Sequence, residues 1–198
     1  MKNYLRKENI RNIYVMILSV CFLVMIVFAA GTTFARDKDR PNIDRDRTFI
    51  ECNKEVAVTA VHTAAVGLGE ILKDIKRENW RVDIIRSFIS PIRFYDDKSG
   101  YFYVYDYKCT NIAHATEKGL EGKNLYNYRD KKGKFVIREL SAAAKKGGGF
   151  VEYHWVKPGH KNEFKKIGYV EPIPGTNYFI GTGVYVPDWT QRRPGSKR

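Results

Sequence analysis

The stretch 147–159, GGGFVEYHWVKPG, decides how the second half of the chain is organised. Its three glycines end the helical pattern before it, and its Pro-Gly pair ends the run that follows. Between them Tyr153, Trp155 and Lys157 occupy alternate positions, and alternate residues of a β-strand point to one face of the sheet. The stretch therefore predicts a strand over 150–156 that carries a phenol, an indole and an ammonium side by side.

Upstream of this strand the chain predicts helices. Apolar residues recur at helical spacing over 48–75, a length of about 28 residues or roughly 40 Å. The predicted stripe on one face of this helix consists of Val56, Ala60, Thr63, Gly67, Ile71 and Ile75. A second, shorter helix is expected over 79–88 and is stopped by Pro91.

After Pro91 the apolar period changes to two, which is typical of strands. The expected strands are 101–105, 111–115, 150–156, 166–171 and 178–185, with a helix over 135–146 and an irregular segment over 118–132. A long helix followed by five antiparallel strands indicates an α+β domain with helices on one face of the sheet. The other face is then free to form a covered pocket.

The N-terminus is basic and runs into an uncharged apolar stretch, 13–30, near the lower length limit for a membrane-spanning helix. Small residues follow, as at signal-peptidase sites. We interpret 1–35 as a cleaved signal peptide or an uncleaved membrane anchor, 36–47 as a linker, 48–187 as one domain and 188–198 as a loose basic tail. Either reading of 1–35 places the domain outside the cytoplasm, secreted or held at the cell membrane.

The net charge of +13 raises nucleic acid as a partner, but export and the scattering of the charges argue against it. The charge favours a small anionic ligand over a cationic one. Cys52 and Cys109 remain outside the apolar stretch, and they can be free, paired with each other or paired between chains. No Cys/His ligand cluster is present, so we expect neither a metal nor another cofactor.

No hydrolase, nucleotide-binding or zinc-protease motif is present, and we do not expect an enzyme. A ligand pocket is better supported, because aromatic walls with a few polar tips are how small-molecule sites are built. The candidate binding residues are Arg93, Tyr101, Tyr103, His114, Tyr153, Trp155 and Lys157. Each has a structural alternative: the aromatic residues and His114 can belong to the core, Arg93 can pair with Asp96 or Asp97, and Lys157 can face water.

The series IRFYDDKSGYFYVYDY, NIAHA, GGGFVEYHW, KKIGYVEPIPG and GTGVY resembles the single Cache domain of type 2, an extracytoplasmic sensor module of chemoreceptors and sensor kinases. The resemblance covers nearly all of 50–186. It implies a PAS-like fold, in which a long N-terminal helix packs on an antiparallel sheet. It also implies a pocket for small molecules, often short carboxylates, that uses the aromatic, His and Lys positions named above.

Two departures from the family stand out. Where the family usually has glycine in the turn between the first two strands, this chain has Cys109, which costs on the order of 1 kcal/mol if the turn needs a positive φ. The chain also ends about a dozen residues after GTGVY, where receptors have a second transmembrane helix. We therefore expect a sensor domain that binds a small organic anion and signals through a separate partner. The alternatives are a non-binding dimerisation module and the remnant of a truncated chemoreceptor.

Overall fold

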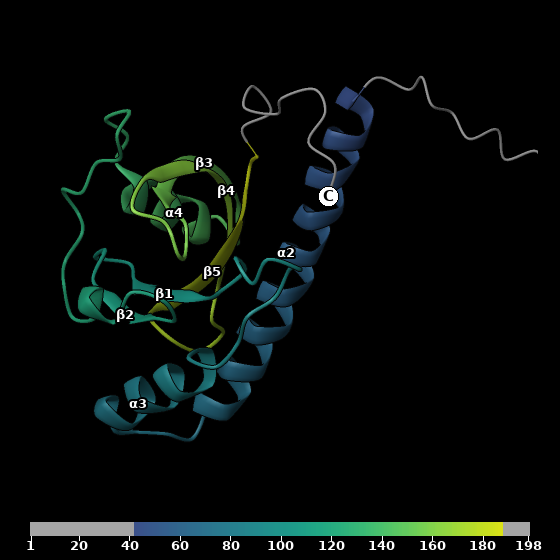
Figure 1. The fold of residues 1–198 in the computed structure, drawn as a ribbon. Coiled ribbons are helices and arrows are strands. Elements are labelled where there is room, and N and C mark those ends of the chain that lie inside the picture. The colour runs from purple at the N-terminus through teal and green to yellow at the C-terminus, as the bar shows by residue number, and fades with distance from the viewer. Residues whose placement is uncertain (1–41, 188–198) are drawn as a thin grey trace, which may run out of the picture. The chain divides into compact units, whose positions relative to one another are not determined.

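The computed structural model describes residues 42–187, which contain one five-stranded antiparallel sheet and its flanking helices (Figure 1). The predicted signal peptide or anchor and the basic tail lie outside the described residues. Helix α2 spans Asn42–Leu72 and α3 spans Glu78–Ile89. Residues 42–47, assigned to a linker from the sequence, form the first turns of α2, because nothing in this charged segment breaks a helix.

The strands confirm the α+β fold class. They are β1 Tyr103–Asp106, β2 Asn111–His114, β3 Gly149–Val156, β4 Glu163–Pro172 and β5 Tyr178–Tyr185, in the spatial order β2-β1-β5-β4-β3. A short 3-10 helix, Lys118–Leu120, and helix α4, Val136–Lys145, connect β2 to β3. Strand β4 begins earlier than expected, because β3 and β4 stay paired without interruption as far as Val156 and Glu163.

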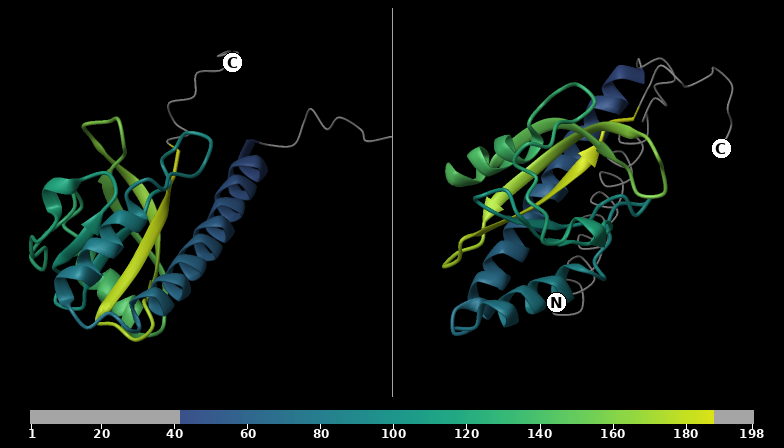
Figure 2. Two further views of the ribbon diagram at one scale, coloured as in Figure 1. Left: turned by 90° about the horizontal axis from the view of Figure 1, so that it is seen from below. Right: turned by 90° about the vertical axis from the view of Figure 1, so that its left-hand side faces the viewer.

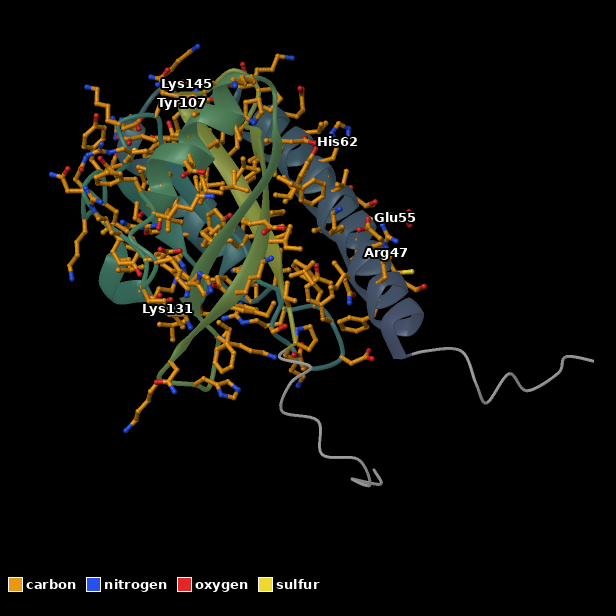
Figure 3. The ribbon with its side chains drawn as sticks, turned by 90° about the horizontal axis from the view of Figure 1, so that it is seen from above. Arg47, Glu55, His62, Tyr107, Lys131 and Lys145 are labelled. Atoms are coloured by element: carbon orange, nitrogen blue, oxygen red, sulfur yellow. The ribbon has the colours of Figure 1, made fainter. Side chains whose placement is uncertain are left out.

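Helices cover both faces of the sheet, which corrects the expectation of helices on one face. The views from below (Figure 2) and from above (Figure 3) place α2 on one side of the sheet, and α4 lies on the opposite side. Helix α3 contacts β2 at the end of the sheet. The sheet thus separates α2 from α4, and the space between β3, β4 and α4 is where a covered pocket can form.

The face of α2 that packs on the domain is not the stripe identified from the sequence. The buried residues are Ala57, Val61, Ala64, Ala65, Leu68 and Leu72. In the predicted stripe, by contrast, Val56 is 44% exposed and Ile71 is 50% exposed. The helix carries two adjacent apolar stripes, and spacing alone does not say which one meets the sheet. The 47–72 part of α2 is long and apolar enough to cross a membrane, but its buried face belongs to the core of the domain.

The turn between β1 and β2 confirms the unusual position of Cys109, whose φ is +69°. The carboxylate of Asp106 holds this turn by accepting the backbone N–H groups of Lys108 at 2.9 Å and Thr110 at 2.7 Å. Cys109 is buried and Cys52 is exposed, and both are free thiols. The left-handed turn is therefore maintained by hydrogen bonds and burial rather than by glycine.

Candidate ligand-binding pocket

Strand register brings chemically distinct side chains to one face of the sheet. Tyr103 of β1 pairs with His114 of β2 on one side and with Gly181 of β5 on the other. On the far side of β5, Tyr153 of β3 pairs with Lys166 of β4. Because cross-strand partners point to the same face, these side chains converge beneath α4 although they come from four separate segments.

These side chains enclose a cavity. It is lined by Tyr101, Tyr103, Tyr105, His114, Val136, Ile137, Leu140, Tyr153, Trp155 and Lys166. The aromatic residues, His114 and Lys166 come from the strands or from the residues next to them, and the aliphatic residues come from α4, which covers the cavity. Its volume is about 10 Å³, close to what a single water molecule requires. A larger ligand therefore fits only if some of the lining side chains move.

Glycines form the floor of the cavity. A Cβ on Gly181 would lie 2.7 Å from Cε2 of Tyr103, and a Cβ on Gly183 would lie 2.7 Å from Cε of Lys166. Gly168 of β4 pairs with Gly183 of β5, and a Cβ on Gly168 would collide with the ring of Tyr153. The missing side chains allow the aromatic rings and the lysine to lie flat against the backbone of the sheet.

Lys166 is the main site residue that the sequence reasoning missed. It is 1% exposed, and its Nζ lies 4.0 Å from the ring centre of Tyr101, 4.7 Å from that of Tyr185 and 5.6 Å from that of Tyr103. Burial lowers the pKa of this amine to about 7, against a weaker opposing effect of the Glu117 carboxylate. The available signal was the alternation Lys166-Gly168-Val170, which puts this lysine on the inner face of β4.

His114 is held as a neutral ring with a defined tautomer. Its Nδ1 accepts the backbone N–H of Glu117 at 2.9 Å, so the ring proton resides on Nε2. Burial lowers the pKa of His114 to about 3, and the nearby charges of Lys166, Lys118 and Arg93 act in the same direction. The Nε2–H group is therefore a neutral donor that a ligand in the cavity can use.

The tyrosine hydroxyls form two separate hydrogen-bonded pairs. Tyr185 donates to the backbone oxygen of Val156 at 2.6 Å, which leaves Tyr101, 3.2 Å away, as the donor to the Tyr185 oxygen. Tyr103 and Tyr153 lie 3.2 Å apart, hydroxyl to hydroxyl. Burial raises the pKa of both, so these phenols stay protonated near neutral pH.

Tyr105 adds a polar group that was not among the binding residues predicted from the sequence. Tyr105 lines the cavity, and its buried hydroxyl makes no direct hydrogen bond within residues 42–187, although the nearby Asn111 side chain partly offsets the rise that burial causes in its pKa. An unpaired buried hydroxyl costs free energy, on the order of 1–3 kcal/mol. Because a ligand with an acceptor oxygen would remove this cost, the Tyr105 hydroxyl is a candidate donor.

Trp155 supplies a wall rather than a free donor. Its Nε1 donates to a carboxylate oxygen of Glu117 at 2.8 Å, and its ring stacks on His114 with centres 6.2 Å apart. Glu117 thus positions both residues, through its side chain and its backbone N–H. It was not identified from the sequence, because a lone glutamate after a short strand has no distinguishing pattern.

Two predicted site residues do not line the cavity. Arg93 donates to the backbone oxygens of Ser90, Ile92 and Ala115, and so ties the end of α3 to the end of β2. Lys157 lies beyond the end of β3 and pairs with Asp97 at 2.8 Å.

The ion pair of Lys157 belongs to the rim of the domain. Burial opposes the charge of Asp97, but hydrogen bonds from Lys157 and Ser99 outweigh it and hold the pKa of Asp97 below its usual value. The structure thus gathers five of the seven predicted residues, Tyr101, Tyr103, His114, Tyr153 and Trp155, and places the other two outside the pocket.

A model of the Cache domain family (dCache_2) matches residues 58–194. The chain belongs to the Cache domain family. This confirms the resemblance drawn from the motif series, and the match spans the sheet, α3, α4 and about half of α2.

Two curated relatives match about half of this Cache chain. The sensor histidine kinase MctS of Rhizobium johnstonii is 41% identical over 91 residues, and the methyl-accepting chemotaxis protein McpP of Pseudomonas putida is 33% identical over 93 residues. Each alignment covers 46% of this chain but only 20% and 17% of the respective relative. The chain therefore matches a small part of these longer signalling proteins.

Solved sensor domains match the Cache fold over most of the described residues. A methyl-accepting chemotaxis protein from Vibrio parahaemolyticus is 31% identical with a TM-score of 0.64, covering 74% of this chain and 97% of that one. A Cache chemosensory domain, solved for its recognition of carboxylic acids, is 30% identical with a TM-score of 0.58, covering 75% of this chain and all of that one. The chain thus contains a sensor domain of the kind found in chemoreceptors.

Proposed function

We propose that this Cache domain acts outside the cytoplasm as a sensor that binds a short monocarboxylate in the cavity beneath α4. The observation that carries the proposal is the buried amine of Lys166, which lies among aromatic rings with no carboxylate bonded to it. A buried amine in such a site favours an anion, because the anion supplies the charge that the protein does not.

The other lining groups favour a carboxylate with a short apolar tail. His114 Nε2–H and the Tyr105 hydroxyl are donors for carboxylate oxygens. The aliphatic side chains of Val136, Ile137 and Leu140 suit an alkyl tail. No lining residue is acidic, so an amino acid would find no partner for its ammonium. The carboxylic-acid recognition described for the related Cache chemosensory domain supports the same ligand class.

Calorimetric titration of the full chain with acetate, propionate, pyruvate and lactate tests the proposal. We expect at least one of them to bind, and Lys166→Gln to weaken that binding roughly 10- to 150-fold, the range for loss of a hydrogen bond to a charged group. Lys157→Ala is the matched control and should bind normally, because Lys157 lies at the rim. A flat response to all four acids would reject the proposal.

We further infer that binding feeds signal transduction of the chemotaxis type, in the periplasm or at the cell membrane. The kinship with a sensor kinase and a chemotaxis receptor supports this role. The signalling partner is then either a separate receptor or a further part of the same protein. Affinity purification of the full chain from solubilised membranes, with and without the acid, identifies the protein that co-purifies with it.

A dimerisation module is a second candidate function, and the outer stripe of α2 favours it. Val56 and Ile71 are exposed, and Val56 lines an apolar groove of about 720 Å³ bounded by Phe88 and Ile92. A second copy of α2 would cover this surface. Sedimentation velocity should show a dimer that Val56→Asp disrupts, whereas Val66→Asp, equally exposed but outside the groove, should leave it intact. A monomer at all concentrations would exclude this function.

A further inference from the structure

The amine of Lys166 is enclosed by groups that stabilise a positive charge only weakly. Three aromatic rings face its Nζ, and among residues 42–187 no carboxylate, carbonyl or hydroxyl bonds to it. Cation–π contacts alone stabilise an ammonium by about 2 kcal/mol or somewhat more when it is desolvated. That is less than the several kcal/mol that burial costs an ion, so burial makes this amine much easier to deprotonate than an exposed lysine, and above pH 7 the free site holds mainly the neutral amine.

The titratable groups around this amine come from every element that packs against it. They are Tyr101 just before β1, Tyr103 and Tyr105 of β1, His114 of β2, Tyr153 of β3, Tyr185 of β5 and Glu117 after β2. Helix α4 contributes only Val136, Ile137 and Leu140. The phenols and the imidazole are neutral near pH 7. Glu117 is the sole carboxylate of this set, and its Oε1 is bonded to the indole of Trp155.

We propose that the pocket takes up a proton together with its carboxylate, and that Lys166 is the group that receives this proton. The inference rests on the proposed function and specifies how that site responds to pH. In the reaction, the neutral amine, one proton from solution and the anion combine into an ammonium–carboxylate pair, so no charge is left uncompensated. The domain then responds to the product of anion and proton concentrations rather than to the anion alone.

Lys166 suits this role better than His114. Both are buried and line the same cavity, but His114 already uses Nδ1 to accept a hydrogen bond from the backbone. Protonating that nitrogen would break the bond, and burial together with neighbouring cations lowers the pKa of His114 to about 3. Lys166 has no such bond to lose, and its pKa of about 7 lies within the working range of pH.

The coupling has a defined pH profile. Below the pKa of the free amine, about 7, Lys166 is already charged and the dissociation constant should not change with pH. Above that value, the fraction of Lys166 that is charged falls tenfold with each pH unit. The dissociation constant should therefore rise about tenfold per unit. The acid itself is ionised throughout this range and adds no pH dependence of its own.

Calorimetry of propionate binding to the full chain, at pH 6 and pH 8.5 in buffers of different ionisation enthalpy, measures the protons taken up. The slope of observed enthalpy against buffer ionisation enthalpy should be close to zero at pH 6 and close to one at pH 8.5. Lys165→Gln, the exposed neighbour, should keep this slope. A slope near zero at pH 8.5 with propionate bound would overturn the inference but leave the proposed function standing.

Lys166→Arg tests whether residue 166 is the group that takes up the proton, because a guanidinium stays charged at both pH values. If this variant folds, judged by circular dichroism, it should bind propionate without proton uptake. Continued proton uptake by the folded variant would assign the proton to another group and overturn the inference. The absence of propionate binding to the parent chain at either pH would overturn the proposed function and this inference together.

Discussion

Lys165 and Lys166 are neighbours in the sequence, yet they lie in opposite environments. The Lys165 side chain is 47% exposed and pairs with Glu152 on the outer face of the sheet. Lys166 is 1% exposed and faces the cavity. Strand alternation alone separates them, and the difference in solvation is what makes one amine an ordinary surface charge and the other a candidate ligand group.

Replacing Lys166 with Met should stabilise the domain at pH 7. The folded pKa of about 7 lies below the usual value of 10.5, so between these values the unfolded chain binds a proton that the folded chain does not. The free energy of unfolding of the parent should therefore rise from pH 7 toward 10.5, and Lys166→Met should lack this rise. Urea denaturation at pH 7 and 9.5 measures it, with Lys165→Met as control. Identical pH dependence in parent and variant would contradict the prediction.

His114 should make the domain sensitive to acid. Its folded pKa of about 3 lies below the usual 6.5, so the unfolded chain binds the extra proton as the pH falls through 6.5 toward 3. Stability is lost over that interval. His114→Asn retains an acceptor for the Glu117 N–H but cannot titrate, so its unfolding free energy should fall less between pH 6.5 and 4. Denaturation curves at both pH values decide, and a parallel fall in both proteins would refute this account.

The residues predicted for the site divide according to strand geometry. Tyr103, Tyr153 and Trp155 lie on one face as expected, because alternation holds while a strand continues, and Tyr101 reaches the same cavity although β1 begins two residues after it. Lys157 failed to join them because β3 ends at Val156. Its partner, Asp97, lies in a loop that no local pattern connects to it. Lys166 was missed because a Lys-Lys pair in a short strand looks like a solvated edge.

At the scale of elements, the glycines of β4 and β5 matter as much as the aromatic residues that they accommodate. Gly168 and Gly183 are cross-strand partners, and Gly181 follows on the same face of β5. Together they leave a strip of sheet with no side chains. Helix α4 lies over this strip, so the pocket is formed between the glycines of the sheet and the aliphatic side chains of the helix.

Gly183→Ala should distort this floor. The new Cβ would lie 2.7 Å from Cε of Lys166 and 2.8 Å from the backbone oxygen of Ile167, and the backbone contact cannot relax easily. Overpacking of this kind costs about 1–3 kcal/mol, and it should also weaken carboxylate binding. Gly119→Ala, whose Cβ meets nothing within 4 Å, is the control. Thermal unfolding and calorimetry of both variants test this, and normal stability of Gly183→Ala would disprove the floor's role.

The element boundaries were largely predictable, but their packing was not. Period-two and period-3.6 patterns predicted each strand and α-helix within residues 42–187, but not the short 3-10 helix Lys118–Leu120, which lies in the segment expected to be irregular. The side of the sheet that each helix occupies depends on contacts between segments far apart in the sequence, which local periodicity does not contain. Both α2, with its two apolar stripes, and α4, expected beside α2 but found across the sheet from it, show this limit.

At the scale of the whole molecule, a ligand that fills the cavity should stabilise the domain. Propionate at 100 times its dissociation constant contributes about 2.7 kcal/mol to the native state. For a domain of this size that corresponds to roughly 5–10 °C in melting temperature. A fixed propionate concentration near saturation at pH 6 should shift the melting temperature more than the same concentration at pH 8.5. Differential scanning calorimetry measures both shifts, and equal shifts at the two pH values would contradict proton-coupled binding.

The position of Trp155 gives the domain an intrinsic optical reporter. The chain has three tryptophans, of which Trp189 lies outside the described residues. Trp155 is 6% exposed, stacks on His114 and is bonded to the Glu117 carboxylate, whereas Trp80 is 51% exposed on α3 beside Arg77. Emission from the inner indole is expected at shorter wavelength than emission from the outer one, and iodide should quench the outer one first. A ligand that rearranges the cavity wall must change the quench-resistant component, so fluorescence follows occupancy of the pocket without any added label.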